Sequence, residues 1–107
     1  MDVNQSAVII IANAGDSRSS CLEALAAAGE RNYQEAERLL KDAEEKLLIA
    51  HNEHTNLLVS DARGESVELT LLMVHASDHL ANAETVHDLT EQMIHILKER
   101  EDRKSVV

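Results

Sequence analysis

The sequence of 107 residues contains no proline, phenylalanine or tryptophan, and it has only one tyrosine and three glycines. Without proline and with so few glycines, little in the chain interrupts a helix, whereas alanine, leucine and glutamate are abundant. The runs of β-branched and aromatic residues, separated by turn residues, that strands require are missing. The sequence therefore predicts an all-α protein.

The absence of Phe and Trp leaves the core to aliphatic side chains, each of which buries less surface than an aromatic ring would. No Gly/Ser-rich, Pro-rich or low-complexity stretch divides the chain, so we expect a single domain over residues 1–107. A domain of this size with small core residues is marginally stable alone, and association into oligomers is a common remedy.

Basic residues are also scarce. The sequence has 10 basic and 20 acidic residues, which give it a net charge of −10. This charge argues against nucleic acid or an anionic membrane as a partner and favours a basic protein. The single Cys21 excludes an internal disulfide, is compatible with a reducing compartment, and is expected to be a small core residue. The apolar run at residues 7–12 is too short to span a membrane and follows Asp2 instead of a basic segment, so we expect a cytoplasmic protein.

Apolar residues recur at helical spacing in three segments, for which we expect helices over about residues 5–28, 33–58 and 66–101. Asn32, followed by Glu35, predicts the start of the second helix, and Ser66 is a candidate cap for the third. Long helices joined by short turns predict an antiparallel up-down-up three-helix bundle.

The first helix contains a polar, helix-weak stretch, "NAGDSRSS", at residues 13–20. Two interpretations remain open for it. Either the helix bends there, or the small side chains allow tight packing against a neighbouring element.

The stretch "LLMVHASDHL", residues 71–80, places titratable groups in an apolar helix. At about 100° per residue, Asp78 projects into the middle of an apolar stripe, with His75 to one side of it and His79 further round. The other members of the stripe are Val67, Leu71, Val74, Ala81, Thr85, Leu89 and Ile96. Apolar residues cover so much of this helix that we expect it to be buried on two sides, one of them a subunit interface.

A carboxylate on such a stripe is costly unless it is paired, hydrogen-bonded, metal-bound or protonated. In a symmetric oligomer the Asp78 side chains would converge on the axis, where a divalent cation such as Mg²⁺ would offset their repulsion. The alternative is a carboxylate that a neighbouring polar group satisfies by a hydrogen bond. His75, Asp78 and His79 are spaced to reach one patch, although histidines on a helix are often surface or core residues without a chemical role.

Three blocks of the sequence resemble the enzyme IIA component of the lactose/cellobiose class of the bacterial phosphoenolpyruvate-dependent sugar phosphotransferase system. They are "IIANAGDSRSSCLEAL", "AHNEHTNLL" and "LLMVHASDHL", the last being the most specific. The resemblance implies a homotrimer of three-helix bundles and a phosphotransferase component that carries a phosphoryl group. The phosphocarrier protein HPr would phosphorylate His75, on Nε2, and the group would pass to a cysteine of enzyme IIB, upstream of the membrane component IIC.

The same resemblance places Asp78 at the trimer axis as a metal ligand and gives His79 a supporting role. His54 and Ala81-Asn82 depart from residues that are common in the family. The transported sugar stays open among lactose, cellobiose and chitobiose-type β-glucosides.

Two other interpretations compete with a phosphocarrier. One is a metal-binding bundle in which His51, His54, Asp78 and His79 hold zinc, although neither histidine pair forms an established zinc motif. The other is an adaptor that uses its acidic face and performs no chemistry. Asp78 and the polar stretch at residues 13–20 argue against the adaptor, since a scaffold has little use for them.

Overall fold

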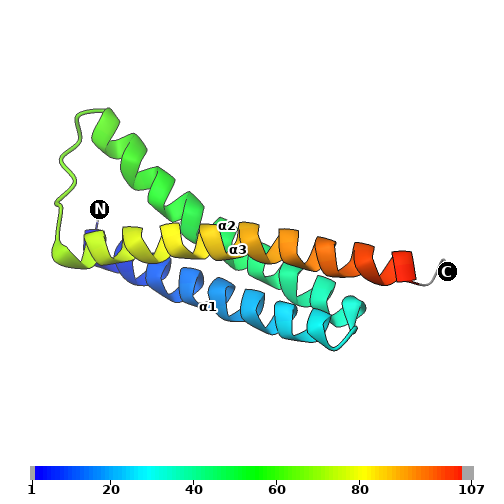
Figure 1. The fold of residues 1–107 in the computed structure, drawn as a ribbon. Coiled ribbons are helices and arrows are strands. Elements are labelled where there is room, and N and C mark those ends of the chain that lie inside the picture. Colours follow the sequence, from blue (N-terminus) through cyan, green and yellow to red (C-terminus); the bar gives the residue numbers. More distant parts are fainter. Residues whose placement is uncertain (1, 105–107) are drawn as a thin grey trace.

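The computed structural model describes residues 2–104, which form three helices: α1 (Val3–Gly29), α2 (Tyr33–Ala62) and α3 (Leu71–Lys104). They run alternately up and down in an elongated bundle with extents of 62 × 20 × 18 Å, and the C-terminal end of α2 diverges from α3 (Figure 1). No strand occurs in this part of the chain. The predicted all-α three-helix bundle is therefore confirmed, while residues 1 and 105–107 of the expected domain lie outside the described residues.

Side chains cap the helices at their starts. Asn32 Oδ1 accepts a hydrogen bond from the Glu35 backbone N–H at 3.2 Å, as the sequence predicted. Asp2 Oδ1 accepts one from the Gln5 N–H at 3.1 Å, which starts α1 at Val3, two residues earlier than expected. Each cap satisfies an amide that has no partner within its helix.

The prediction that Ser66 begins the third helix is wrong. Residues 65–70 are not helical, α2 extends to Ala62, and α3 is capped by Thr70, whose Oγ1 accepts a hydrogen bond from the Met73 N–H at 3.1 Å. The linker connects the diverging end of α2 to the start of α3 (Figure 1), and non-helical backbone spans more distance per residue than helix does. Val67, whose spacing suggested a helix, packs against the core from this linker.

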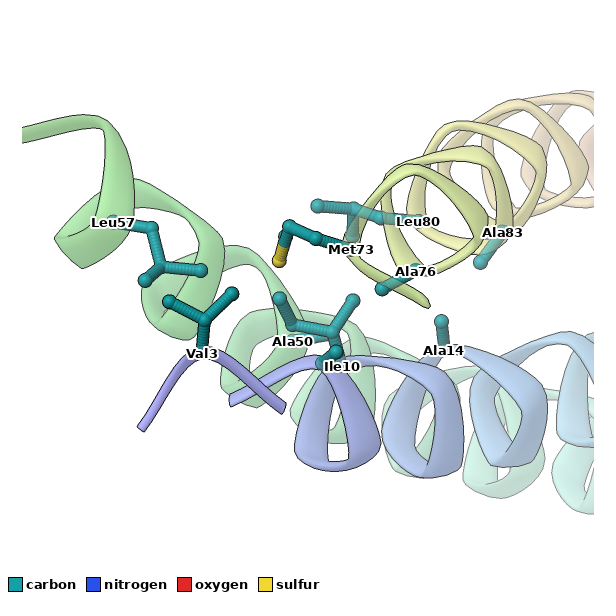
Figure 2. Close-up of a cluster of buried hydrophobic side chains, with 10 residues drawn as sticks. Val3, Ile10, Ala14, Ala50, Leu57, Met73, Ala76, Leu80 and Ala83 are labelled. Carbon is teal, nitrogen blue, oxygen red and sulfur yellow. The ribbon is translucent and has the colours of Figure 1, made fainter. Parts of the chain in front are cut away.

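The core consists mainly of alanines with a few larger aliphatic side chains. Figure 2 shows its larger cluster, in which side chains of all three helices meet; its buried members are Val3, Ala7, Ile10, Ala14, Ala50, Leu57, Met73, Ala76, Leu80 and Ala83. A smaller cluster of Ala24, Ala28, Ala36 and Ile94 lies toward the opposite end. Because so many core side chains are small, the helix backbones approach one another closely.

The polar stretch at residues 13–20 continues the helix and packs against α2 through two buried serines. Ser17 is fully buried, and its hydroxyl donates to the Ala43 carbonyl of α2 at 2.7 Å. Ser20 donates to Asp42 Oδ2 at 2.9 Å. These two bonds fix α1 against α2 through side chains that are short enough for close approach.

One face of α3 remains apolar and exposed in the single chain. Leu71 is 86% exposed and Leu89 58%, and Val74, Met93 and Ile96 are exposed as well. The second buried side expected for this helix is thus not supplied within the described chain. Among residues 2–104, no helix is both long and apolar enough to cross a membrane.

Candidate functional site

The first three turns of α3 display the histidine pair that the sequence singled out. His75 and His79 are one helical turn apart, and their Nε2 atoms lie 3.1 Å from each other. The rings meet edge to face, with centroids 4.5 Å apart and an interplanar angle of 86°. His75 is exposed and His79 is half-buried. Of the three residues expected in one patch, His75 and His79 are in direct contact, whereas Asp78 bonds to neither ring.

The contact between the two rings has a chemical consequence. Two neutral imidazoles can share a hydrogen bond only if one Nε2 carries the proton and the other offers its lone pair. When His79 is the donor, His75 holds its own proton on Nδ1 and presents an unprotonated Nε2. Once it is released from the His79 N–H, such a nitrogen can act as a nucleophile that needs no separate base.

The nearby polar side chains of α3, other than His79, do not orient the His75 ring. In residues 2–104, neither Asp78 nor Asn82 makes a hydrogen bond to the His75 ring. The ring is bonded to His79 instead, and through Nε2. Sequence spacing allowed this contact without selecting it, because i,i+4 neighbours meet only in the right rotamers.

Asp78 is exposed and lies on the apolar face of α3. Within the described chain its carboxylate has no hydrogen bond and no ion pair. The alternative interpretation, a carboxylate that its own chain satisfies, is therefore not what the structure shows. A single carboxylate per chain also provides too few ligands to hold a cation without other copies.

Arg18 is the residue that the sequence interpretation missed. It projects from α1 into a shallow depression of about 370 Å³ lined by Arg18, His79, Asn82 and Val86. Its guanidinium is exposed and forms no ion pair among the described residues. The sequence feature that could have pointed to Arg18 is its position inside the unusual "NAGDSRSS" stretch, in a chain with few basic residues.

The zinc site considered from the sequence is not assembled. His54 Nε2 lies 3.2 Å from Ser77 Oγ, and His51 Nδ1 lies 3.2 Å from Glu84 Oε1. In the part of the chain that the structure describes, neither joins Asp78 or His79 in a group of potential ligands. Both instead connect the C-terminal half of α2, before it diverges, to α3.

Cys21 is fully buried, as predicted for a core residue. Burial raises the pKa of its thiol above 9.0, and the negative charge of Glu44 raises it further, while hydrogen bonds with Ser17 and Thr90 act in the opposite direction. The thiol therefore stays protonated at neutral pH and is a poor nucleophile.

Comparison with known proteins decides the family. Residues 5–98 match the family described as "PTS system, Lactose/Cellobiose specific IIA subunit". The chain belongs to this family. Its members are components of a sugar phosphotransferase system, so a phosphotransfer role in sugar uptake follows from membership.

Individual IIA proteins are similar over most of their lengths. The lichenan-specific phosphotransferase enzyme IIA component of Bacillus subtilis is 48% identical over 87 residues, which cover 81% of this chain and 79% of that protein. The lactose-specific EIIA component of Staphylococcus epidermidis is 40% identical over 83% of this chain and 86% of its own. The crystal structure of the cellobiose-specific enzyme IIA from Bacillus anthracis superposes with a TM-score of 0.89 at 37% identity, covering 95% of this chain and 94% of that one.

Proposed function

We propose that the protein accepts a phosphoryl group from phospho-HPr on His75 Nε2 and passes it to a cysteine of its cognate enzyme IIB. The observation that carries this proposal is the pair of facing Nε2 atoms, 3.1 Å apart, in which His79 can leave the His75 nitrogen unprotonated. In the first step the P–N bond of the donor phosphohistidine breaks as a P–N bond to His75 forms. In the second step that bond breaks as a P–S bond forms on IIB.

The neighbours of His75 supply what phosphoryl transfer requires, namely positioning and stabilisation of charge on the equatorial oxygens. The His79 N–H must release the His75 lone pair before that pair attacks phosphorus, and it is then free to donate to a phosphoryl oxygen. Arg18 has no carboxylate partner in the described chain and lines the same depression as His79. It provides the positive charge that this acidic protein otherwise lacks near the site.

A homotrimer explains the exposed apolar face of α3. Leu71, Val74 and Leu89 surround Asp78 on a surface that a stable monomer would be expected to bury. Packing three copies along this face would bring three Asp78 carboxylates together. Mg²⁺ or another divalent cation suits that set of oxygen ligands, with water completing its coordination.

We propose the cytoplasm as its location, with IIC as the downstream membrane component. The net charge of −10 favours docking of partners with basic surfaces. Similar proteins are named for lichenan, lactose and cellobiose. The transported sugar is accordingly proposed to be lactose, cellobiose or a related β-glucoside.

Intact-mass spectrometry at alkaline pH tests the proposal after incubation with phosphoenolpyruvate, enzyme I and HPr. We expect one acid-labile phosphate on the wild type and none on His75→Ala. His95→Ala is the matched control, because His95 is an exposed histidine of the same helix outside the site. A wild type that stays unmodified, or a His75→Ala protein that still gains phosphate, would overturn the assignment.

A further inference from the structure

Three potential metal ligands from two helices converge away from the histidine pair. They are Glu44 of α2 and His87 and Glu91 of α3, each offering one ligand atom, and these atoms all lie within 4.8 Å of one another. His87 Nε2 is 3.2 Å from Glu44 Oε1. Two ligands about 2.1 Å from a tetrahedral ion are about 3.4 Å apart, so this pair already has the required separation.

The environment of His87 favours a metal-binding orientation. Its side chain is only 12% exposed, so the ring is held in place, whereas that of Glu44 is 48% exposed and leaves a path from solvent. The other ring nitrogen, Nδ1, lies 3.5 Å from Asp88 Oδ1. In the metal-free chain the contact with Glu44 requires a proton on Nε2, because a carboxylate only accepts. A bound metal would take the place of that proton, and the ring would then carry its proton on Nδ1, on the side of Asp88, as is common for histidines that bind metals.

The cluster is separate from the site of the proposed phosphotransfer. At 100° per residue, His87 projects about 180° from Asp78 around α3, and it lies about 18 Å from His75 along the helix. It therefore belongs neither to the exposed apolar face nor to the depression at Arg18. This separation makes it testable independently of the proposed function.

We infer that Glu44, His87 and Glu91 bind a divalent cation of the Zn²⁺ class. One imidazole nitrogen and two carboxylate oxygens match zinc, with water in the fourth position, better than Mg²⁺ or Ca²⁺, which prefer oxygen ligands throughout. The ion connects α2 to α3, which the His51–Glu84 and Lys98–Glu37 pairs otherwise connect at the surface.

Competition with a chromophoric zinc chelator tests the inference on metal-stripped, full-length protein. His87→Gln and Glu91→Gln are compared with their parent, and all proteins carry His75→Gln so that the His75–His79 pair does not compete. His95→Gln is the matched control, because His95 and Glu99 repeat the i,i+4 spacing at 3.7 Å without a third ligand. We expect one Zn²⁺ per chain in the parent and the control, and at least about tenfold weaker binding in the other two.

Glu91→Gln keeps the test decisive if His87→Gln fails to fold. Glu91 has no hydrogen bond or ion pair among residues 2–104, so its replacement leaves the metal-free bundle intact. Zinc should raise the unfolding temperature of the parent and not that of the folded Glu91→Gln protein. The inference would be overturned if Glu91→Gln bound zinc as tightly as its parent. It would also be overturned if His95→Gln lost as much zinc affinity as Glu91→Gln.

Discussion

Replacing Ser17 by valine tests whether short side chains determine how α1 packs against α2. Ser17 is fully buried, and its hydroxyl reaches the Ala43 carbonyl at 2.7 Å, so its side chain lies directly against the backbone of α2. Valine cannot donate this hydrogen bond, and it adds a methyl group where no space is left. The helices must then separate or twist relative to each other.

The expected loss of stability has two parts. Removing one buried neutral hydrogen bond costs about 1 kcal/mol, which Ser17→Ala measures alone. Overpacking typically costs about 1–3 kcal/mol, so Ser17→Val should lose roughly 2–4 kcal/mol in all. An unfolding entropy of about 2.1 cal/mol/K per residue gives about 0.22 kcal/mol/K for 107 residues, and hence a decrease of roughly 9–18 °C in the unfolding temperature.

Thermal unfolding followed by circular dichroism measures these shifts, at equal protein concentration because association also stabilises the fold. Ser19→Val is the matched control, since Ser19 is an exposed residue of the same helix and reports only the helix propensity of valine. If Ser17→Val unfolds at the same temperature as Ser19→Val, the packing argument is refuted.

Four further predictions concern the site and the core. Asp78→Leu should keep or strengthen the proposed trimer, because it would replace converging charges by apolar contacts; sedimentation that finds only monomers would contradict the axial placement. Arg18→Gln should slow phosphorylation by HPr by roughly tenfold to a hundredfold with partial rescue in Arg18→Lys, and an unchanged rate would exclude Arg18. The pKa of the Cys21 thiol is raised in the folded state, so its contribution to stability is complete below pH 9.0 and is lost as the pH rises further. Cys21→Ser should therefore lose less stability than the wild type above pH 9.0, and identical denaturation profiles at alkaline pH would refute this. His54→Gln should leave phosphorylation nearly unchanged, because glutamine can also hydrogen-bond Ser77, whereas a large loss of transfer to IIB would show a direct role for the end of α2.

The fold was predictable where local signals decide it. The Asn32 cap and the helical spacing of apolar residues depend on neighbours within a few positions, and both predictions are confirmed. The start of the third helix was not predictable in this way. Val67 continues the apolar spacing, yet the distance between the end of α2 and the start of α3 requires a non-helical linker, and Thr70 provides the cap instead of Ser66.

The candidate site was likewise predictable only where the signal lies within one helix. The spacing of His75 and His79 within one helix was sufficient to predict that they share a patch. The proximity of Arg18 depends on how α1 is rotated against α3, which no spacing within either helix contains. The exposed state of Asp78 likewise became visible only when the surroundings of α3 were known.

The polar stretch of α1 connects the packing of the bundle to the chemistry proposed for it. Ser17 and Ser20 both bond to α2, which fixes the rotation of α1 about its own axis. Arg18 follows Ser17 at about 100° around the helix, and this fixed rotation directs it to the depression beside His79. A helix with stronger helix formers at these positions would hold its backbone equally well, but larger side chains at positions 17 and 20 would prevent the close approach to α2. The short side chains at positions 17 and 20 are therefore explained by this close approach, which also directs Arg18 toward the proposed site.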